Sequence, residues 1–278
     1  MNLKASVIGM FYIGPIPKLA PSPALVQTRF QIAEINLASA PRWPRLSLGM
    51  KGAAVANLQM ALAQLGYLPI AYGRKISPLT PSGVRQAPAA SWHWHWQYQT
   101  TPATLKALWS RNQYSVVTEG AVMQFQYQNG LTMTGMATPK LFDRISYDMT
   151  HNLRNRQGYS YVLVQKHIPE TLTLWFDGST VTSLTNTGIP QSPTPDGTTP
   201  VYLRYLSQDM SGVNPWGVPY NDPGVPYVSY FNGGDAIHGF VRAAYGFPQS
   251  LGCVELPVQA ARIAWNYIHY GTLVTVIN

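Results

Sequence analysis

The sequence predicts two domains, a small all-α domain followed by a mainly β domain. Within residues 44–148, apolar side chains recur at the spacing of amphipathic helices, whereas in residues 159–278 they gather in short runs separated by turns. Only 11% of the 278 residues are charged, while 23 are Gly, 23 are Pro and 17 are Tyr, which is typical of a β-rich chain with many loops. The length and the 46% hydrophobic content suffice for two cores.

Residues 1–43 form a leader ahead of the first domain. Residues 5–16 are apolar behind Lys4, as in a weak signal segment, and residues 38–40 resemble a cleavage site. The apolar stretch is too short to span a bilayer, so we expect no transmembrane segment. Whether the leader is an export signal or a disordered extension stays open.

Four helices are expected in the first domain, because start and stop residues bracket each apolar pattern. The first helix carries leucines at helical spacing and ends at Gly66. The second begins at Thr101, with proline in its first turn. The third runs from about Thr118 to Gly130, and a short fourth helix begins at Thr138.

An insertion, residues 71–99, separates the first two helices and contains an alternation of Trp and His. If residues 92–96 are extended, His93 and His95 share one face and three indoles share the other. The two histidines are a candidate metal pair, but no third ligand follows at suitable spacing, so we expect neither a metal nor a cofactor. We favour a strand that packs its indoles on the helices; stacking of exposed indoles on sugar rings is the alternative.

The second domain is predicted to contain short strands and one helix. The strands are expected at residues 161–164, 172–176, 181–184, 201–206, 227–231 and 273–277. The helix is expected at residues 258–269. Residues 207–226 are rich in Gly, Pro, Asn and Asp, and they are predicted to form a long loop over the functional site.

The only cysteine, Cys253, follows His238 by fifteen positions. A free thiol, with a pKa of about 8.5, is mostly protonated near neutral pH, and a neighbouring imidazole can take its proton, so the pair suggests a cysteine nucleophile with His238 as general base. The backbone amides of Leu251, Gly252 and Cys253 are candidates for an oxyanion hole. Ser250 lacks a base and is expected to hold the loop. The alternative is a small buried thiol beside a structural histidine.

These residues resemble the signature of the L,D-transpeptidases with a YkuD-like catalytic domain, a His-Gly followed by Ser/Thr-His-Gly-Cys. His238 with Gly239 and residues 250–253 carry the resemblance, and residues 194–202 are similar to the family's Thr-Pro-x-Gly turn and strand. Leu251 replaces the second histidine of the signature. Glu255 stands where the family commonly has Arg or Asn, and we expect it to cap the helix that follows.

The helical domain resembles a peptidoglycan-binding domain of the helical repeat type. The resemblance lies in residues 58–59, 65–67, 125–126 and 129–131. It implies binding to peptidoglycan glycan strands and stem peptides, and an extracytoplasmic location at the cell wall. The net charge of +8 fits such an acidic partner, whereas the basic residues are scattered without a nucleic-acid-binding module, so we expect no nucleic acid.

The resemblance of the second domain implies an L,D-transpeptidase. Cys253 would attack a tetrapeptide stem and release D-alanine, and the acyl-enzyme would pass to a neighbouring amine to give a 3→3 cross-link. An L,D-carboxypeptidase and an inactive cell-wall binding protein are the alternatives. Carbapenems are expected to acylate the same thiol.

Further residues are predicted to support the Cys-His pair. Tyr227, Tyr230 and Phe231 are candidates for lining the substrate cleft, although alternate residues of one strand face opposite sides. Asp235 is a candidate for orienting the ring of His238. In the family that the sequence resembles, a backbone carbonyl commonly orients this ring.

Overall fold

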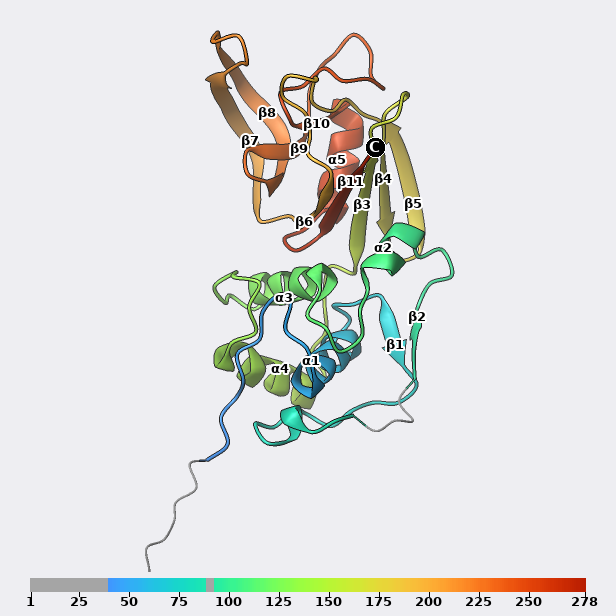
Figure 1. The fold of residues 1–278 in the computed structure, drawn as a ribbon, viewed down its shortest axis with the longest axis vertical. Coiled ribbons are helices and arrows are strands. Elements are labelled where there is room, and N and C mark those ends of the chain that lie inside the picture. Colours follow the sequence, from blue (N-terminus) through green and yellow to red (C-terminus); the bar gives the residue numbers. More distant parts are fainter. Residues whose placement is uncertain (1–39, 89–92) are drawn as a thin grey trace, which may run out of the picture. The chain divides into compact units, whose positions relative to one another are not determined.

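A computed structural model describes residues 40–88 and 93–278 of the chain (Figure 1). The signal segment and most of the leader, together with Trp92 of the Trp-His alternation, lie outside these residues. Residues 41–278 form one compact unit. Within the described ranges, no helix is both long enough and apolar enough to cross a membrane.

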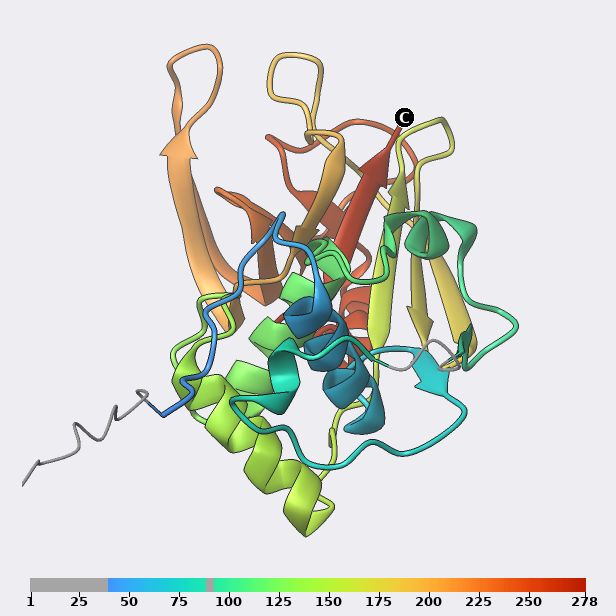
Figure 2. The same ribbon diagram turned by 60° about the horizontal axis from the view of Figure 1, so that its bottom comes forward.

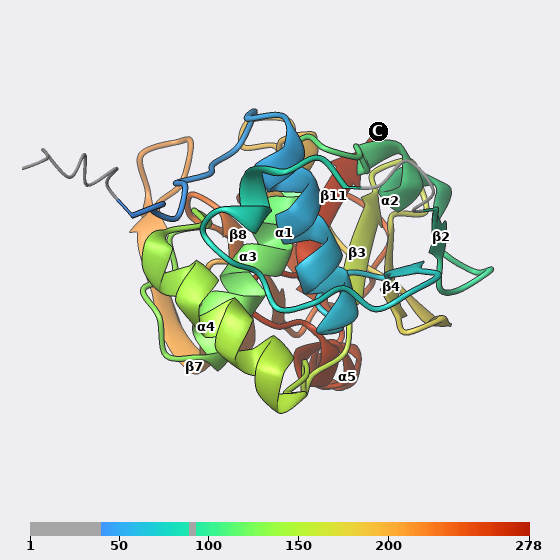
Figure 3. The same ribbon diagram turned by 90° about the horizontal axis from the view of Figure 1, so that it is seen from below.

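Four helices build the first part of the compact unit. They are α1 (Ala53–Gln64), α2 (Ala103–Leu108), α3 (Val116–Gln128) and α4 (Pro139–His151). Helix α1 contacts both α3 and α4, as the view from below shows (Figure 3). The chain leaves α1 through Gly66, whose φ of +83° is the left-handed conformation that a glycine stop provides.

Two details of the helices differ from the sequence prediction. Pro102, rather than Thr101, is the N-cap of α2, because the Thr101 hydroxyl turns back and donates to the carbonyl of Tyr98 at 2.7 Å. Helix α4 has 13 residues and is not short. Met149 continues the buried face that begins at Leu141, and this contact extends the helix by a further turn.

The insertion contains a small sheet. Its elements are β1 (Ile70–Tyr72), the 3-10 helix η1 (Gly83–Arg85) and β2 (Trp94–Trp96), and β1 pairs antiparallel with β2. Trp94 and Trp96 pack on the helical core and meet the ring of Trp109 edge to face, at 5.7 and 6.4 Å between ring centroids. His93 and His95 are exposed. For the residues described here, the strand packs its partly buried indoles on the helical core, as predicted.

The second part of the unit contains two sheets and helix α5 (Val258–Tyr267). One sheet has the order β5 (Ser179–Leu184), β4 (Thr171–Phe176), β3 (Ser160–Gln165), β11 (Leu273–Ile277) and β6 (Gly197–Pro200). The other has the order β10 (Val254–Leu256), β9 (Asp235–Gly239), β8 (Pro219–Asn232) and β7 (Leu203–Val213). Val162 of β3, Ile237 of β9 and Ala261 of α5 belong to one buried cluster, so α5 and both sheets share a core.

The helical core continues into the five-stranded sheet. Tyr161 of β3, Trp175 of β4 and Leu273 of β11 belong to the same buried cluster as the helices. Gly120 of α3 lies so close to Gly271 that a Cβ at position 120 would come within 2.4 Å of the Gly271 carbonyl oxygen. The helices and this sheet therefore pack as one body.

Residues 207–226 do not form a loop, and that prediction is wrong. They belong to a long hairpin of β7 and β8 that turns at residues 214–218 (Figure 2). The register shifts between Gln208 and Met210, as in a β-bulge. Only the last residues of β8 pair with β9, so its prolines lie in a two-stranded ribbon with a free edge, where a missing N–H is tolerated.

Candidate functional site

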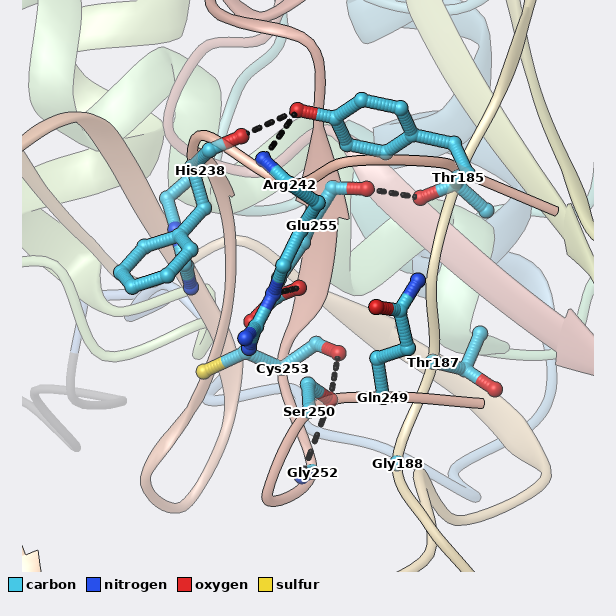
Figure 4. Close-up of polar contacts among 12 residues, drawn as sticks. Thr185, Thr187, Gly188, His238, Arg242, Gln249, Ser250, Gly252, Cys253 and Glu255 are labelled. Carbon is cyan, nitrogen blue, oxygen red and sulfur yellow. Dashed lines mark hydrogen bonds and ion pairs between the residues drawn. The ribbon is translucent and has the colours of Figure 1, made fainter. Parts of the chain in front are cut away.

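Strands β9 and β10 bring the predicted catalytic residues to one face of a sheet. The strands pair in parallel, with Glu255 opposite His238. Because side chains alternate along a strand, Cys253, two residues before Glu255, points to the same face. All three side chains line a cavity of about 530 Å³, which we call the catalytic cavity. Figure 4 shows His238, Cys253 and Glu255 gathered at this place.

The loop that carries the cysteine, residues 249–253, is fixed by a segment from elsewhere in the chain. The Thr187 carbonyl accepts hydrogen bonds from the backbone N–H groups of Gln249 and Ser250, at 2.9 and 3.0 Å. The N–H and hydroxyl of Thr187 donate to the two carboxylate oxygens of Glu170, each at 2.6 Å. Glu170 is fully buried, and burial raises its carboxyl pKa. A buried acid therefore positions the loop, and no sequence motif pointed to it.

Ser250 closes this loop on itself (Figure 4). Its hydroxyl donates to the Cys253 carbonyl at 2.5 Å and accepts from the Gly252 N–H at 3.2 Å. Among the described residues, the backbone N–H groups of Leu251 and Cys253 have no hydrogen-bond partner. Of the three amides predicted for an oxyanion hole, that of Gly252 is already engaged, and the other two can donate to a ligand.

The thiol of Cys253 is protonated at rest. Burial is the largest influence on its pKa, which is raised to about 12; a backbone hydrogen bond with Ala236 lowers it, and the carboxylates of Asp235 and Glu255 raise it further. The thiol lies 3.9 Å from the carbonyl oxygen of Gly234, to which it donates. To act as a nucleophile, this thiol would have to lose its proton.

His238 is a neutral base. It is only 3% exposed, and burial lowers its pKa, while a hydrogen bond with Gly239 and the charge of Glu255 act in the opposite direction. Its Nδ1 lies 3.1 Å from the Gly239 carbonyl oxygen. Because a carbonyl only accepts, Nδ1 carries the ring proton and Nε2 keeps a lone pair. This carbonyl orients the ring, whereas Asp235 accepts from the side chain of Asn232 at 3.0 Å.

Two glycines permit close packing at the site. Gly252 has a φ of +119°, and a Cβ there would lie 2.3 Å from a carboxylate oxygen of Asp235. A Cβ on Gly239 would lie 3.1 to 3.3 Å from atoms of Pro226, Ala261 and Val258. The first glycine therefore makes room for an acid beside the nucleophile loop, and the second lets β9 pass close to α5.

Glu255 does not cap the helix that follows, and that prediction is wrong. Helix α5 begins at Val258 and has no acidic residue in its first turn. Glu255 lies in β10, is 4% exposed, and forms a bidentate ion pair with Arg242, with N–O distances of 2.8 and 2.7 Å. The register opposite His238 turns its side chain toward the cavity. Sequence reasoning missed Arg242, because nothing in the spacing of the chain relates it to Glu255.

Only one of the three candidate cleft aromatics lines the catalytic cavity. Tyr230 does, and its hydroxyl donates to Gln208 at 3.0 Å. Phe231 points to the other face of β8 and is 3% exposed in the core. Tyr227 packs against the same core and against Trp265, at 6.2 Å between ring centroids. Neither Tyr227 nor Phe231 lines the catalytic cavity.

The β7–β8 hairpin supplies residues that line the catalytic cavity and that were not predicted, because residues 207–226 were expected to form a loop. They are Gln208, Asp209, Met210, Ser211, Tyr220 and Asp222. Tyr220 and Asp222 follow the alternation of a strand, whereas residues 208–211 are consecutive and lie at the register shift between Gln208 and Met210, so alternation alone would not have indicated all of them.

The lining of the catalytic cavity carries negative charge. Asp209, Asp222 and Asp235 contribute carboxylates, and the one Lys or Arg among its described lining residues, Arg242, is paired with Glu255. Within the described ranges, the side-chain carboxylate of Asp222 has neither a hydrogen bond nor an ion pair, although, beside the hydrogen bond with Glu255, its charge contributes to raising the pKa of Arg242. In residues 40–88 and 93–278, no three His, Cys, Asp or Glu side chains are grouped as a metal site would need.

Two family models match the chain. Residues 159–276 match YkuD, the L,D-transpeptidase catalytic domain. Residues 99–145 match a model described as "Putative peptidoglycan binding domain", so α1 and the insertion precede the matched range. Comparison with curated protein sequences gave no match.

Solved L,D-transpeptidases are similar to part of the chain. The catalytic domain of an E. faecium L,D-transpeptidase is 25% identical over 42% of this chain and 96% of that domain, with a TM-score of 0.39. The same domain acylated by ertapenem is 25% identical over 43% and 97%, with a TM-score of 0.38. L,D-transpeptidase 3 from Mycobacterium tuberculosis is 22% identical over 44% of this chain, with a TM-score of 0.39, and the chain spans 62% of that structure. The chain is therefore similar, over residues 159–276, to the L,D-transpeptidase catalytic domain of the YkuD family, and the match to a peptidoglycan-binding domain precedes that range.

Proposed function

We propose that this chain is an L,D-transpeptidase that forms 3→3 cross-links in peptidoglycan through a thioester on Cys253. One observation carries the proposal: the parallel pairing of β9 and β10 puts the thiol and the neutral ring of His238 on one face of one cavity. The family match over residues 159–276 supports the class of enzyme.

In the first half-reaction, the sulfur of Cys253 attacks the carbonyl carbon between the third stem residue and the terminal D-alanine. His238 Nε2 takes the thiol proton as the C–S bond forms, and the carbonyl electron pair moves onto oxygen. The C–N bond then breaks, the ring returns the proton to the leaving amine, and D-alanine departs. Because burial raises the thiol pKa to about 12, the attack is coupled to proton transfer rather than made by a preformed thiolate.

The oxyanion of the tetrahedral intermediate needs hydrogen-bond donors. We assign this role to the backbone N–H groups of Leu251 and Cys253, which have no other partner in the described part of the chain. The Gly252 N–H is excluded, because it donates to Ser250. Ser250 acts by keeping the loop in shape.

In the second half-reaction, the side-chain amine of a neighbouring stem peptide attacks the thioester. His238 accepts a proton from the amine, the C–S bond breaks, and the thiol is restored by that proton. The acceptor arrives as an ammonium ion, which the negative lining of the cavity attracts, with the carboxylate of Asp222 as a candidate partner. It releases one proton to solvent before the attack, because only the free amine has a lone pair; the proton that His238 accepts is lost from the amine as the C–N bond forms. Water as acceptor would make the enzyme an L,D-carboxypeptidase; the acidic lining favours the amine.

The ion pair of Glu255 bears on the alternative of an inactive cell-wall binding protein. An uncompensated acid beside the nucleophile would oppose thiolate formation. Here Arg242 neutralises Glu255 through two hydrogen bonds. The departure from the family signature at position 255 is therefore compatible with catalysis, which supports the enzyme over the binding protein.

The same proposal has consequences for inhibition by carbapenems and for the location of the protein. The strained amide of a carbapenem places an electrophilic carbonyl where the stem-peptide carbonyl would lie, so we propose a one-to-one adduct on Cys253. The two peptidoglycan-related family matches support an extracytoplasmic, cell-wall-associated protein.

The test is incubation with a disaccharide-tetrapeptide, followed by mass analysis of the products. Cross-linked dimer is expected from the unaltered chain, and its loss in Cys253→Ala and in His238→Gln. His95→Gln, which changes an exposed imidazole, serves as the control and should retain activity. Tripeptide without dimer would identify a carboxypeptidase. Absence of any Cys253-dependent product would contradict the enzyme proposal.

A further inference from the structure

A second cavity, of about 370 Å³, shares no residue with the catalytic cavity. It lies at the C-terminal end of α1, against residues 71–76, which include the end of β1, and residues 152–154, which follow α4; we call it the α1 cavity. Every described residue that lines it falls outside residues 99–145 and 159–276, the ranges that the family models match. The α1 cavity therefore lies outside the two ranges that the family models match.

The α1 cavity is basic. Arg74, Lys75 and Arg154 line it, and the described lining contains neither Asp nor Glu. Within residues 40–88 and 93–278, Lys75 takes part in no ion pair, and Arg154 is bound only through Nη2, which donates to the Gln64 carbonyl at 3.0 Å. A guanidinium has five N–H donors, so Arg154 can bind an anion without releasing Gln64.

Gln64 holds the backbone next to Lys75 and the side chain of Arg154. Its side chain accepts a hydrogen bond from the Ile76 N–H at 2.8 Å and donates to the Ile76 carbonyl at 3.3 Å. The carbonyl of the same residue anchors Arg154. One residue at the end of α1 thus holds both the segment that contains Lys75 and the side chain of Arg154, which lowers the entropic cost of binding a ligand between them.

The floor of the α1 cavity is apolar. Met60, Leu65 and Met149 line it and are 2%, 2% and 6% exposed. The volume lies near the lower end of the roughly 300–1,000 Å³ of small-molecule sites. The cavity therefore suits a ligand that has an oxyanion at one end and aliphatic groups beside it, such as the end of a short peptide.

We propose that the α1 cavity binds the free carboxylate end of a peptide, with the carboxylate between Lys75 and Arg154 and the aliphatic side chains on the methionine floor. The identity of that peptide rests on the proposed function: it is an uncross-linked stem peptide, held while another stem occupies the catalytic cavity. The chain then has two attachment points for one polymer, only one of which does chemistry.

The test measures binding to the full chain carrying Cys253→Ala, so that no turnover occurs. The probe is a synthetic stem tetrapeptide with a free C-terminal carboxylate, titrated by calorimetry beside the same peptide ending in a carboxamide. Lys75→Gln combined with Arg154→Gln is expected to weaken binding of the free acid about tenfold, the effect of losing a charge-assisted hydrogen bond. The amide should bind as weakly to the unaltered site as the acid binds to the variant.

Matched controls keep the result specific. Lys106→Gln with Arg111→Gln removes two exposed cations that do not line the cavity and should leave affinity unchanged. Lys75→Arg should retain binding, and equal thermal unfolding of all variants establishes that they fold. Equal affinity for acid and amide, or an unchanged affinity in the double variant, would overturn the proposal. Tighter binding of glycerol phosphate than of the peptide would overturn the assignment to a peptide carboxylate.

The readout separates this inference from the proposed function. Acylation of Cys253 by a soluble donor, measured in the double variant with its native cysteine, should proceed at the unaltered rate. If the unaltered chain shows no Cys253-dependent product but binds the acid through Lys75 and Arg154, the proposed enzyme fails and the binding site stands.

Discussion

The catalytic cavity and the α1 cavity carry opposite charge within one compact unit. Three aspartates line the first, and its one arginine is neutralised by a buried glutamate, whereas the second has three cations and no acid among its described lining residues. The net charge of +8 describes neither cavity by itself. It favours approach to an anionic polymer, and in our proposal the local charges decide which group of that polymer enters which cavity.

The two cavities also differ in how their charged groups are held. In the catalytic cavity, strand pairing fixes the side chains, because the register of β9 and β10 determines which residues share a face. In the α1 cavity, hydrogen bonds from one helix end hold a loop and an arginine. Rigid positioning suits a reaction whose atoms must align within a fraction of an ångström, and a looser cationic surface suits retention of a ligand.

The largest expected effect is that of His238→Gln, which should slow acylation in the catalytic cavity and leave binding in the α1 cavity unchanged. His238→Gln removes the base but keeps a side chain that can donate to the Gly239 carbonyl, and acylation of Cys253 should slow about 10²- to 10⁴-fold. Binding of the free-acid tetrapeptide at the α1 cavity should not change. Mass spectrometry of the acyl-enzyme over time measures the first, and calorimetry the second. As a control, His269→Gln alters another mostly buried histidine that lines neither cavity, and acylation should persist.

The next effect concerns the ion pair that neutralises the arginine of the catalytic cavity. Glu255→Gln leaves Arg242 without its charge partner, and we expect the free energy of unfolding to fall by about 2 kcal/mol, less than for a fully buried pair because the Arg242 side chain is 31% exposed. Urea unfolding of the full chain measures this loss.

The exposed ion pair between Lys166 and Asp196 provides the matched control. Its N–O distance is 2.8 Å, but the Asp196 side chain is 55% exposed, so Asp196→Asn should cost less than about 0.5 kcal/mol. Similar losses for the two substitutions would show that the Glu255 pair is no more important to the fold than a surface contact.

The third effect is the pH dependence of acylation in the catalytic cavity. Burial lowers the pKa of His238, so its ring stays neutral at pH values below the ordinary histidine pKa of about 6.5. The acylation rate should therefore be constant near neutral pH. It should fall about tenfold for each pH unit only when the pH drops below the lowered pKa of His238. The stability that this depressed pKa contributes is present above about pH 6.5 and is lost as the pH falls through the folded value. Acylation rates from pH 4.5 to 8 test this. A rate that rises tenfold per unit above pH 7 would instead indicate attack by a free thiolate.

The sharing of one cavity by Cys253 and His238 could be predicted from sequence, because both residue types are rare and both lie beside glycines. Cys253 is the only thiol, and the strand pairing that joins it to His238 agrees with the alternation of each short run. The helices could also be predicted from sequence, because their apolar period and their glycine stops are local signals. The boundaries of α2 and α4 could not be predicted as well, since side-chain turns and tertiary contacts decide them.

The charged surroundings of the pair could not be predicted, because they come from residues that tertiary pairing brings together. Arg242 lies in a loop and contacts Glu255. Glu170 holds the loop of residues 249–253 through Thr187. Asp222 lies on a hairpin that was predicted to be a loop. In each case the sequence shows the residue but not its partner. Proline and glycine in residues 207–226 favoured the prediction of a loop. The strands form nevertheless, because a two-stranded ribbon with a free edge tolerates both residue types.

The smallest expected effect tests the charge of the catalytic cavity itself. Asp222→Asn should raise the KM for the amine acceptor about two- to fivefold, the range of a partly exposed ion pair, and shift the products from dimer toward hydrolysed tripeptide. The acylation step, which involves no ammonium ion, should change less. High salt should reduce the difference from the unaltered enzyme, because mobile ions screen the attraction. Asp196→Asn, outside the cavity, should leave the product ratio as it is, and an equal shift in that variant would mean that the overall charge of the protein, rather than the acidic lining, selects the acceptor.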